Sequence, residues 1–208
     1  MKKIIRILSG TLFGLAIMFS SCKKKDEVVP DPQPSKFNTT KFDGTMFVIH
    51  DTIYAPAHDK GSRSFFNSDT LKVLTSNQIN AKLSLSDGVI FGYFFSSDTS
   101  GSVIANTYAY FDTILTSGWH KTTTIFRKNV PLSSYINVAT SNDILNAWNA
   151  ATPYTGTNSG GYIYKLAVDQ VFAYTTQAGK VGLIRIISVI PGNNPYSDYV
   201  LFEIKMQK

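Results

Sequence analysis

The sequence predicts a mainly β domain: an antiparallel, sandwich-like fold with one or two short helices and a C-terminal β-meander. Ser, Thr and Asn together supply about a quarter of the 208 residues, and aromatic residues supply 13%. This composition favours strands and turns over helices. The C-terminal segment also alternates side chains in the two-residue period of a strand. The length suits a single domain of roughly 150–200 residues with a sizeable core.

The meander is the clearest element of the prediction. Turn signals at 177–179 and 191–195 separate three strand-like segments, which are 169–176, 180–190 and 199–206. In the last of them Val200, Phe202, Ile204 and Met206 share one face. The middle segment is apolar on both faces apart from Arg185, which indicates a strand that is covered on both sides.

Further strands are expected towards the N-terminus. The segments rich in strand-forming residues are 45–54, 71–75, 81–85, 89–95 and 162–168. Asp87-Gly88 lies between two of them and predicts a hairpin. Residues 96–126 are ambiguous, because they show neither the helical nor the strand periodicity.

One helix is predicted after residue 140. Ser141 is a suitable N-cap, and Ile144, Leu145, Ala147, Trp148 and Ala151 follow on one face before Pro153 stops the helix. Trp148 is accordingly expected in the core.

The first 21 residues predict a secretory signal. Lys2, Lys3 and Arg6 precede an apolar run from Leu8 to Phe19, which is too short for a membrane core of about 30 Å. The only cysteine of the chain, Cys22, follows directly. This arrangement resembles a bacterial lipobox, which implies cleavage before Cys22 and lipid attachment to its thiol. The alternative is an ordinary signal peptide with a cysteine nearby by chance.

Residues 22–36 predict a lipidated, disordered tether, and residues 37–208 a single domain. Lys23-Lys24-Lys25-Asp26-Glu27 is followed by three prolines within five residues, a composition that favours an extended chain. This region resembles outer-membrane lipoproteins of the Bacteroidetes, in which a Lys and two acids behind the cysteine accompany export to the cell surface. Segments 88–95 and 178–186 also resemble uncharacterised lipoproteins of that group. The resemblance implies a protein held at the outer membrane and facing the exterior.

Charge and motifs exclude several function classes. Removal of the signal lowers the formal net charge from +6 to +3, and no basic cluster typical of nucleic-acid binding remains. One cysteine leaves no disulfide scaffold and, once lipidated, no thiol nucleophile. No nucleotide, zinc-protease, serine-hydrolase or EF-hand motif is present. The sequence therefore predicts a protein that is not an enzyme and needs no cofactor.

The three histidines are weak candidates for metal or haem binding. His50 and His58 are each followed by aspartate, and His120 follows Trp119. Imidazole binds transition metals, and a carboxylate can fix its tautomer. The competing interpretation is that all three are ordinary polar residues.

Aromatic residues in polar surroundings form the candidate ligand site. Tyr108, Tyr110, Trp119 and Tyr154 lie in or beside expected loops, where aromatic rings could stack on the apolar faces of sugars. Packing inside the domain is the competing role for each ring.

Three Asp-Thr-aliphatic sequences resemble the acceptor motif for O-glycosylation in exported Bacteroidetes proteins. They contain Thr52, Thr70 and Thr113. Thr70 and Thr113 are the better candidates because hydroxyls beside turns remain exposed, whereas Thr52 lies inside an expected strand.

The expected protein is thus a surface lipoprotein that binds without catalysing a reaction. Its partners would be the membrane, through Cys22, and a glycan or an outer-membrane protein; no nucleic-acid partner is expected. Haem or metal binding is the second hypothesis, and an undetected hydrolase is the third.

Overall fold

The computed structural model describes residues 40–42, 44–55, 61–96, 101–105, 116–153, 161–191 and 198–208, and these form two antiparallel sheets. Sheet A contains, in spatial order, β1 (Thr40–Phe42), β2 (Met46–Tyr54), β12 (Tyr199–Gln207), β11 (Val181–Ile190), β10 (Val171–Thr175), β7 (Ile125–Lys128) and β8 (Thr152–Pro153). Sheet B contains β4 (Lys72–Thr75), β3 (Arg63–Asn67), β5 (Val89–Ser96), β6 (Gly101–Ala105) and β9 (Tyr162–Ile163). The predicted mainly β class is confirmed. The predicted signal, 1–21, and tether, 22–36, lie outside the described residues.

The predicted C-terminal meander is confirmed. Strands β10, β11 and β12 pair in sequence order, and β12 also pairs with β2 along its whole length. A bulge between Ile186 and Ser188 interrupts the β11–β12 register. The four residues predicted to share one face of β12 are all buried.

The main core lies between the two sheets. Sheet A contributes apolar residues from β2, β10, β11 and β12, and sheet B contributes Phe66, Ile90 and Phe91. The ring of Phe202 meets those of Phe66 and Phe91, each at a centroid distance of 6.0 Å. This contact between the two inner faces is the packing of a β-sandwich.

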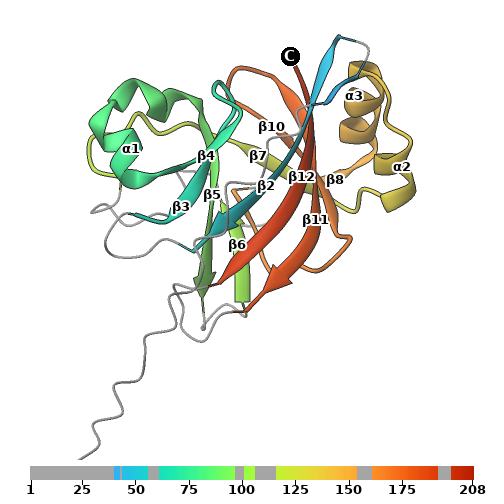
Figure 1. The fold of residues 1–208 in the computed structure, drawn as a ribbon. Helices are drawn as coiled ribbons and strands as arrows, with labels where there is room; N and C mark the ends of the chain where they lie inside the picture. The colour runs from blue at the N-terminus through green and yellow to red at the C-terminus, as the bar shows by residue number, and fades with distance from the viewer. Residues whose placement is uncertain are drawn as a thin grey trace, which may run out of the picture. The chain divides into compact units, whose positions relative to one another are not determined.

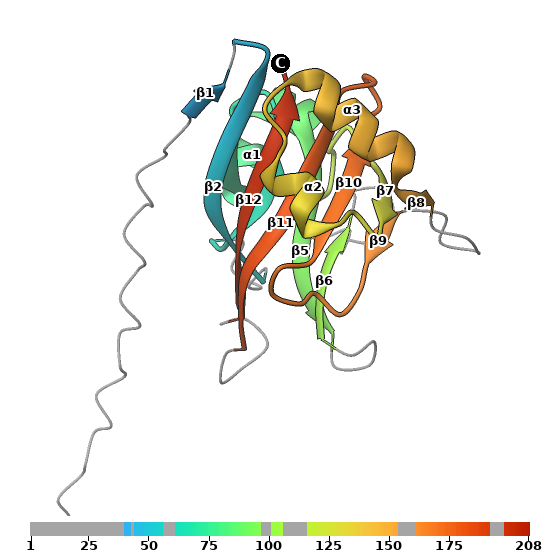
Figure 2. The same ribbon diagram turned by 90° about the vertical axis from the view of Figure 1, so that its right-hand side faces the viewer.

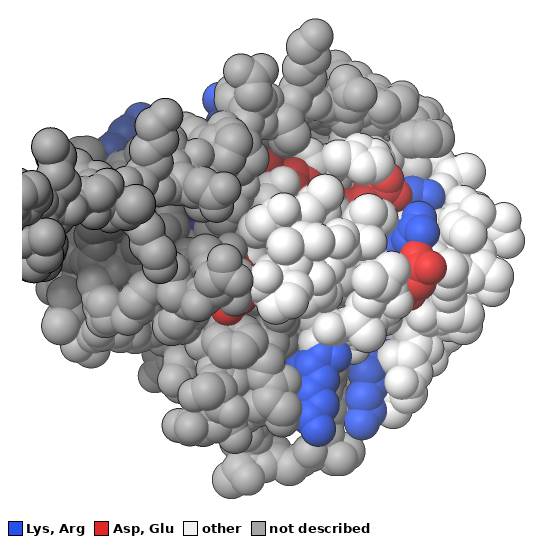
Figure 3. All heavy atoms as spheres, turned by 60° about the horizontal axis from the view of Figure 1, so that its bottom comes forward, with Lys and Arg blue, Asp and Glu red and all other residues white. Residues whose placement is uncertain are grey.

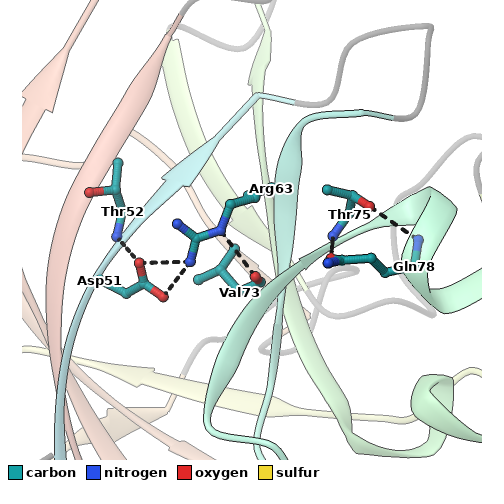
Figure 4. Close-up of polar contacts among 6 residues, drawn as sticks. All are labelled: Asp51, Thr52, Arg63, Val73, Thr75 and Gln78. Carbon is teal, nitrogen blue, oxygen red and sulfur yellow. Dashed lines mark hydrogen bonds and ion pairs between the residues drawn. The ribbon is translucent and has the colours of Figure 1, made fainter. Parts of the chain in front are cut away.

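A buried ion pair also joins the sheets. Arg63 of β3 donates through Nη2 to both carboxylate oxygens of Asp51 of β2, at 3.0 and 2.9 Å (Figure 4). Its Nε donates to the carbonyl of Val73, and the Thr52 N–H donates to Asp51. The Asp51 side chain is fully buried.

Helices cover part of the outer face of sheet A. Helices α2 (Leu132–Ile136) and α3 (Ser141–Ala150) pack on this face through Tyr135 and Ile144, together with Val138 from the connection between them. Figure 2 shows both helices over the upper part of β10, β11 and β12, while the lower ends of β2, β12 and β11 extend beyond them. The first part of β11 is therefore covered on both faces, as predicted, whereas the end of the strand is half-buried to exposed. None of the described helices is long and apolar enough to cross a membrane.

The helix prediction needs two corrections. Thr140, not Ser141, caps α3, because its hydroxyl accepts from the Asp143 N–H while Asp143 bonds back to the Thr140 N–H. This reciprocal pair is a capping box. Leu145 is 38% exposed rather than buried, whereas Trp148 packs beside the core with Arg127 over its ring.

A second helical layer lies on the outer face of sheet B. Helix α1 (Ser76–Ala81) and a 3-10 helix, η1 (Leu83–Gly88), pack against Phe65, Leu74 and Val89. Figure 1 shows α1 on the side of the molecule opposite to α2 and α3.

The predicted strand 81–85 and the hairpin at Asp87-Gly88 are therefore wrong. Thr75 and Gln78 form a capping box that starts α1 just before this segment (Figure 4), and η1 continues to Gly88. Strand 162–168 is also too long, because β9 contains only Tyr162 and Ile163. Strand β3 and helix α2 are missing from the prediction.

Candidate functional site

A polar depression lies where turns of the two sheets face each other. This pocket, called the turn pocket below, has a volume of about 140 Å³. Sheet B supplies its β3–β4 turn and the end of η1, and sheet A supplies the β10–β11 turn. Residues that line it include Asp69, Asp87, Ile90, Thr122, Gln177 and Lys180.

Asn67 organises the sheet B wall of the turn pocket. It is 1% exposed, and its Oδ1 accepts from the N–H groups of Asp69 and Thr70 and from the Thr70 hydroxyl. Its Nδ2 donates to the Leu85 carbonyl at 2.6 Å, which ties the turn to η1. A Cβ on Gly88 would lie 2.7 Å from Asp69 Oδ2. The glycine therefore gives the Asp69 carboxylate room to lie against the backbone.

His120 holds the second carboxylate of this wall. Its ring Nδ1 lies 2.9 Å from Asp87 Oδ1, and its backbone N–H donates to the Ser86 hydroxyl. Ser86 is buried and in turn donates to the Leu83 carbonyl. Both side chains of the His120–Asp87 pair are mainly exposed, so this pair contributes little to stability.

The sheet A wall is an equally well bonded turn. Thr176 N–H donates to the Lys180 carbonyl, and the Lys180 N–H donates back to the Thr176 hydroxyl. Gly179 adopts φ +79°, which a turn at this position requires and glycine adopts without strain. Gln177 Oε1 accepts from the Thr123 N–H, which leaves the NH₂ end of the amide as a donor.

A pair of tyrosines forms a second candidate site at the β9 edge of sheet B. The rings of Tyr162 and Tyr164 lie 4.4 Å apart in an edge-to-face arrangement. Both are half-buried and pack against Phe94. We call these two residues the tyrosine edge.

The predicted aromatic site is only partly visible. Tyr108, Tyr110 and Tyr154 lie outside the described residues. Trp119 is 7% exposed, packs edge-to-face on Phe65 at 4.8 Å, and donates its Nε1–H to Asn80. Its ring belongs to the core under α1, so it presents no open stacking face.

His50 is not part of the turn pocket. It belongs to a hydrogen-bond network on the outer face of sheet A. Its Nε2 lies 2.6 Å from Glu203 Oε2, and Tyr135 donates to the other oxygen of Glu203 at 2.7 Å. Lys205 donates to the Tyr135 and Val138 carbonyls beneath α2. Burial lowers the pKa of Lys205, although Glu203 opposes that shift, and burial together with Glu203 raises the pKa of Tyr135.

The histidines are not brought together as a metal site in the described part of the chain. His50 pairs with Glu203, His120 pairs with Asp87, and His58 lies outside the described residues. No group of three or more His, Cys, Asp or Glu side chains that the structure describes could hold a metal ion.

The modification sites are placed unevenly. Thr70 lies in the β3–β4 turn, where its hydroxyl donates to Asn67. Thr52 is half-buried inside β2. Thr113 and Cys22 lie outside the described residues. O-glycosylation stays a prediction, which the intact mass of protein from its native host would test.

Charged side chains stand apart from one another on one face of the molecule. Figure 3 shows one face, on which Lys and Arg side chains and Asp and Glu side chains stand in small separate groups among uncharged residues. Among the described residues of this face, basic side chains form no continuous row.

The sequence matches no known family model. No curated protein matches it either. The structure is similar to the crystal structure of a DUF4466 family protein from Parabacteroides merdae, at 14% sequence identity and a TM-score of 0.48. The similarity covers 78% of this chain and 61% of that one, so the chain spans about three fifths of the length of that structure.

Proposed function

We propose that this chain is a lipoprotein anchored in the outer membrane through lipid on Cys22, and that its domain binds a glycan at the cell surface without catalysing a reaction. The anchor rests on the single cysteine behind a short apolar signal. Two or more acyl chains hold a protein stably on a membrane. An outer-membrane protein is the other partner class that such a module could serve.

The tyrosine edge is the observation that supports glycan binding. Half-buried tyrosines keep a rigid ring and a hydroxyl available, so they gain contact area at a small cost in conformational entropy. Strand β6 ends at Ala105, which pairs with Tyr162 at the start of β9. Tyr162 is thus held at the edge of sheet B by its pairing with β6.

Replacement of Cys22 should remove the membrane anchor. We expect mass spectrometry of the native protein to find an acylated Cys22 as the first residue. Cys22→Ala protein should leave the membrane fraction and the detergent phase. Trypsin added to intact cells should release the domain by cleavage near Lys23–Lys25, because the domain faces outward. Equal membrane partitioning of the variant, or protection of the domain from trypsin, would contradict the anchor or the orientation respectively.

Glycan binding should depend on the tyrosine edge. On a glycan array, we expect Tyr162→Ala and Tyr164→Ala each to weaken binding of any glycan hit by at least about fivefold, or roughly 1 kcal/mol, as loss of an aromatic contact does. Tyr199→Ala is the matched control, because Tyr199 is half-buried in another tyrosine pair, with Tyr54, on sheet A.

Each outcome of that experiment separates the hypotheses. No glycan hit on the array, or equal loss in Tyr199→Ala, would overturn the glycan proposal. Release of shortened sugars during incubation would identify a hydrolase instead. A Soret shift on addition of haemin would favour the haem hypothesis.

A further inference from the structure

The turn pocket contains opposite charges that do not neutralise each other. Asp69 and Lys180 both line it, yet neither takes part in an ion pair within the part of the chain that the structure describes. Asp87 pairs with His120 through Oδ1. The acids belong to the sheet B wall and the lysine to the sheet A wall, so the pocket has an anionic side and a cationic side.

Hydrogen bonds fix the backbone of both walls before any ligand arrives. The buried Asn67 carboxamide sets the turn that carries Asp69, and hydrogen bonds between Thr176 and Lys180 close the opposite turn. Sites that are preorganised in this way lose little conformational entropy on binding. Gln177 adds a neutral donor beside Lys180, and Ile90, which is 3% exposed, supplies an apolar floor.

Charge and size restrict the ligand class. A volume of about 140 Å³ is well below the roughly 300–1,000 Å³ of pockets for drug-sized molecules, so the occupant has few heavy atoms. A simple anion would meet two carboxylates, and a simple cation would meet the Lys180 ammonium. A neutral polyol would leave both unpaired charges without a counter-charge. A molecule with one ammonium and one carboxylate satisfies both walls through charge-assisted hydrogen bonds.

We propose that the turn pocket binds a small zwitterion of amino-acid size. The ligand ammonium donates to Asp69 and to the free oxygen of Asp87. The ligand carboxylate accepts from Lys180 and from the Gln177 amide, and a short aliphatic side chain lies on Ile90. This site shares no residue with the tyrosine edge, so it adds a function to the proposed glycan binding and does not depend on it.

Alanine and its two capped forms test the proposal on the full-length chain. N-acetylalanine lacks the ammonium, and alaninamide lacks the carboxylate. In saturation-transfer NMR titrations we expect alanine to bind at least tenfold more tightly than either capped form. Asp69→Asn should reduce the preference for alanine over N-acetylalanine to within about threefold while it keeps the preference over alaninamide. Lys180→Met should reduce the preference for alanine over alaninamide to within about threefold while it keeps the preference over N-acetylalanine.

Controls make the result specific to the pocket. Lys82→Met removes an exposed lysine outside the pocket, and Tyr162→Ala removes part of the tyrosine edge; neither should change alanine binding. The proposal is overturned if wild-type protein gives no alanine signal, or if the capped forms bind equally well. It is also overturned if the two pocket variants change both preferences alike. Displacement of alanine by a neutral sugar would assign the pocket to the glycan and would likewise overturn the zwitterion.

Discussion

Arg63→Met is expected to lower the free energy of unfolding by about 3–5 kcal/mol at neutral pH, the usual cost of leaving one member of a buried ion pair alone. The Asp51 side chain is fully buried, and Arg63 of the other sheet donates to both of its carboxylate oxygens through Nη2. Methionine fills much of the space of the arginine stem but donates no hydrogen bond. The variant therefore keeps the packing and loses the counter-charge. Urea denaturation measures the effect.

The double variant Asp51→Leu with Arg63→Met separates the charge effect from the packing effect. Replacement of a whole buried pair by apolar residues of similar volume is often neutral or stabilising. We expect the double variant to be within about 1 kcal/mol of wild type, or more stable than it. Losses that simply add in the double variant would show that Asp51 and Arg63 act independently, contrary to the geometry.

The cost of Arg63→Met should also depend on pH. Burial raises the pKa of Asp51, and the attraction of Arg63 opposes that rise. The folded state then binds a proton more readily than the unfolded state, so Asp51 makes the domain less stable as pH rises through its folded pKa. Without Arg63 this pKa rises further. The difference in the free energy of unfolding between Arg63→Met and wild type should be largest at neutral pH. It should shrink at mildly acid pH, where Asp51 takes up a proton.

The strands near the C-terminus were predictable because their side chains carry a two-residue period and their turns carry strong signals. The two-residue period could not show which other elements of the fold cover each face of a strand. Lys205 has the position of an outward residue in β12, but α2 covers it, and it is 7% exposed. Helix α2 has only five residues, too few to show a helical period.

In the segment 76–88 a helix-capping signal outweighs the strand-forming composition of residues 81–85. Thr75 and Gln78 bond reciprocally and start α1, so the chain turns away from the sheet before residues 81–85 could form a strand. A capping box has the sequence Thr-x-x-Gln, which was the signal that could have identified this helix.

The turn pocket could not be predicted from the sequence because four separate stretches of the chain build it. The Asn67-Ser68-Asp69 and Gln177-Ala178-Gly179 turn signals are visible in the sequence. Their meeting, however, depends on how sheet A lies on sheet B. That arrangement follows from the shared core of Phe66, Phe91 and Phe202, and no local pattern encodes it.

Gly182→Ala is expected to destabilise the domain by about 3 kcal/mol, at the upper end of the usual cost of overpacking a core. Gly182 of β11 pairs directly with Tyr174 of β10. The tyrosine ring lies over the glycine so closely that an added Cβ would overlap Cζ and Oη of Tyr174. Tyr174 is fully buried in the core between the sheets, so its ring cannot move aside without displacing its neighbours.

Replacement of Tyr174 provides the control for Gly182→Ala. In a Tyr174→Leu background the overlapping ring atoms are gone, and the same Gly182→Ala change should cost less than about 1 kcal/mol, even though Tyr174→Leu itself destabilises the core. Denaturant unfolding of the four proteins gives the coupling energy directly. An equal cost of Gly182→Ala in both backgrounds would show that the glycine serves backbone conformation and not the close approach of the Tyr174 ring.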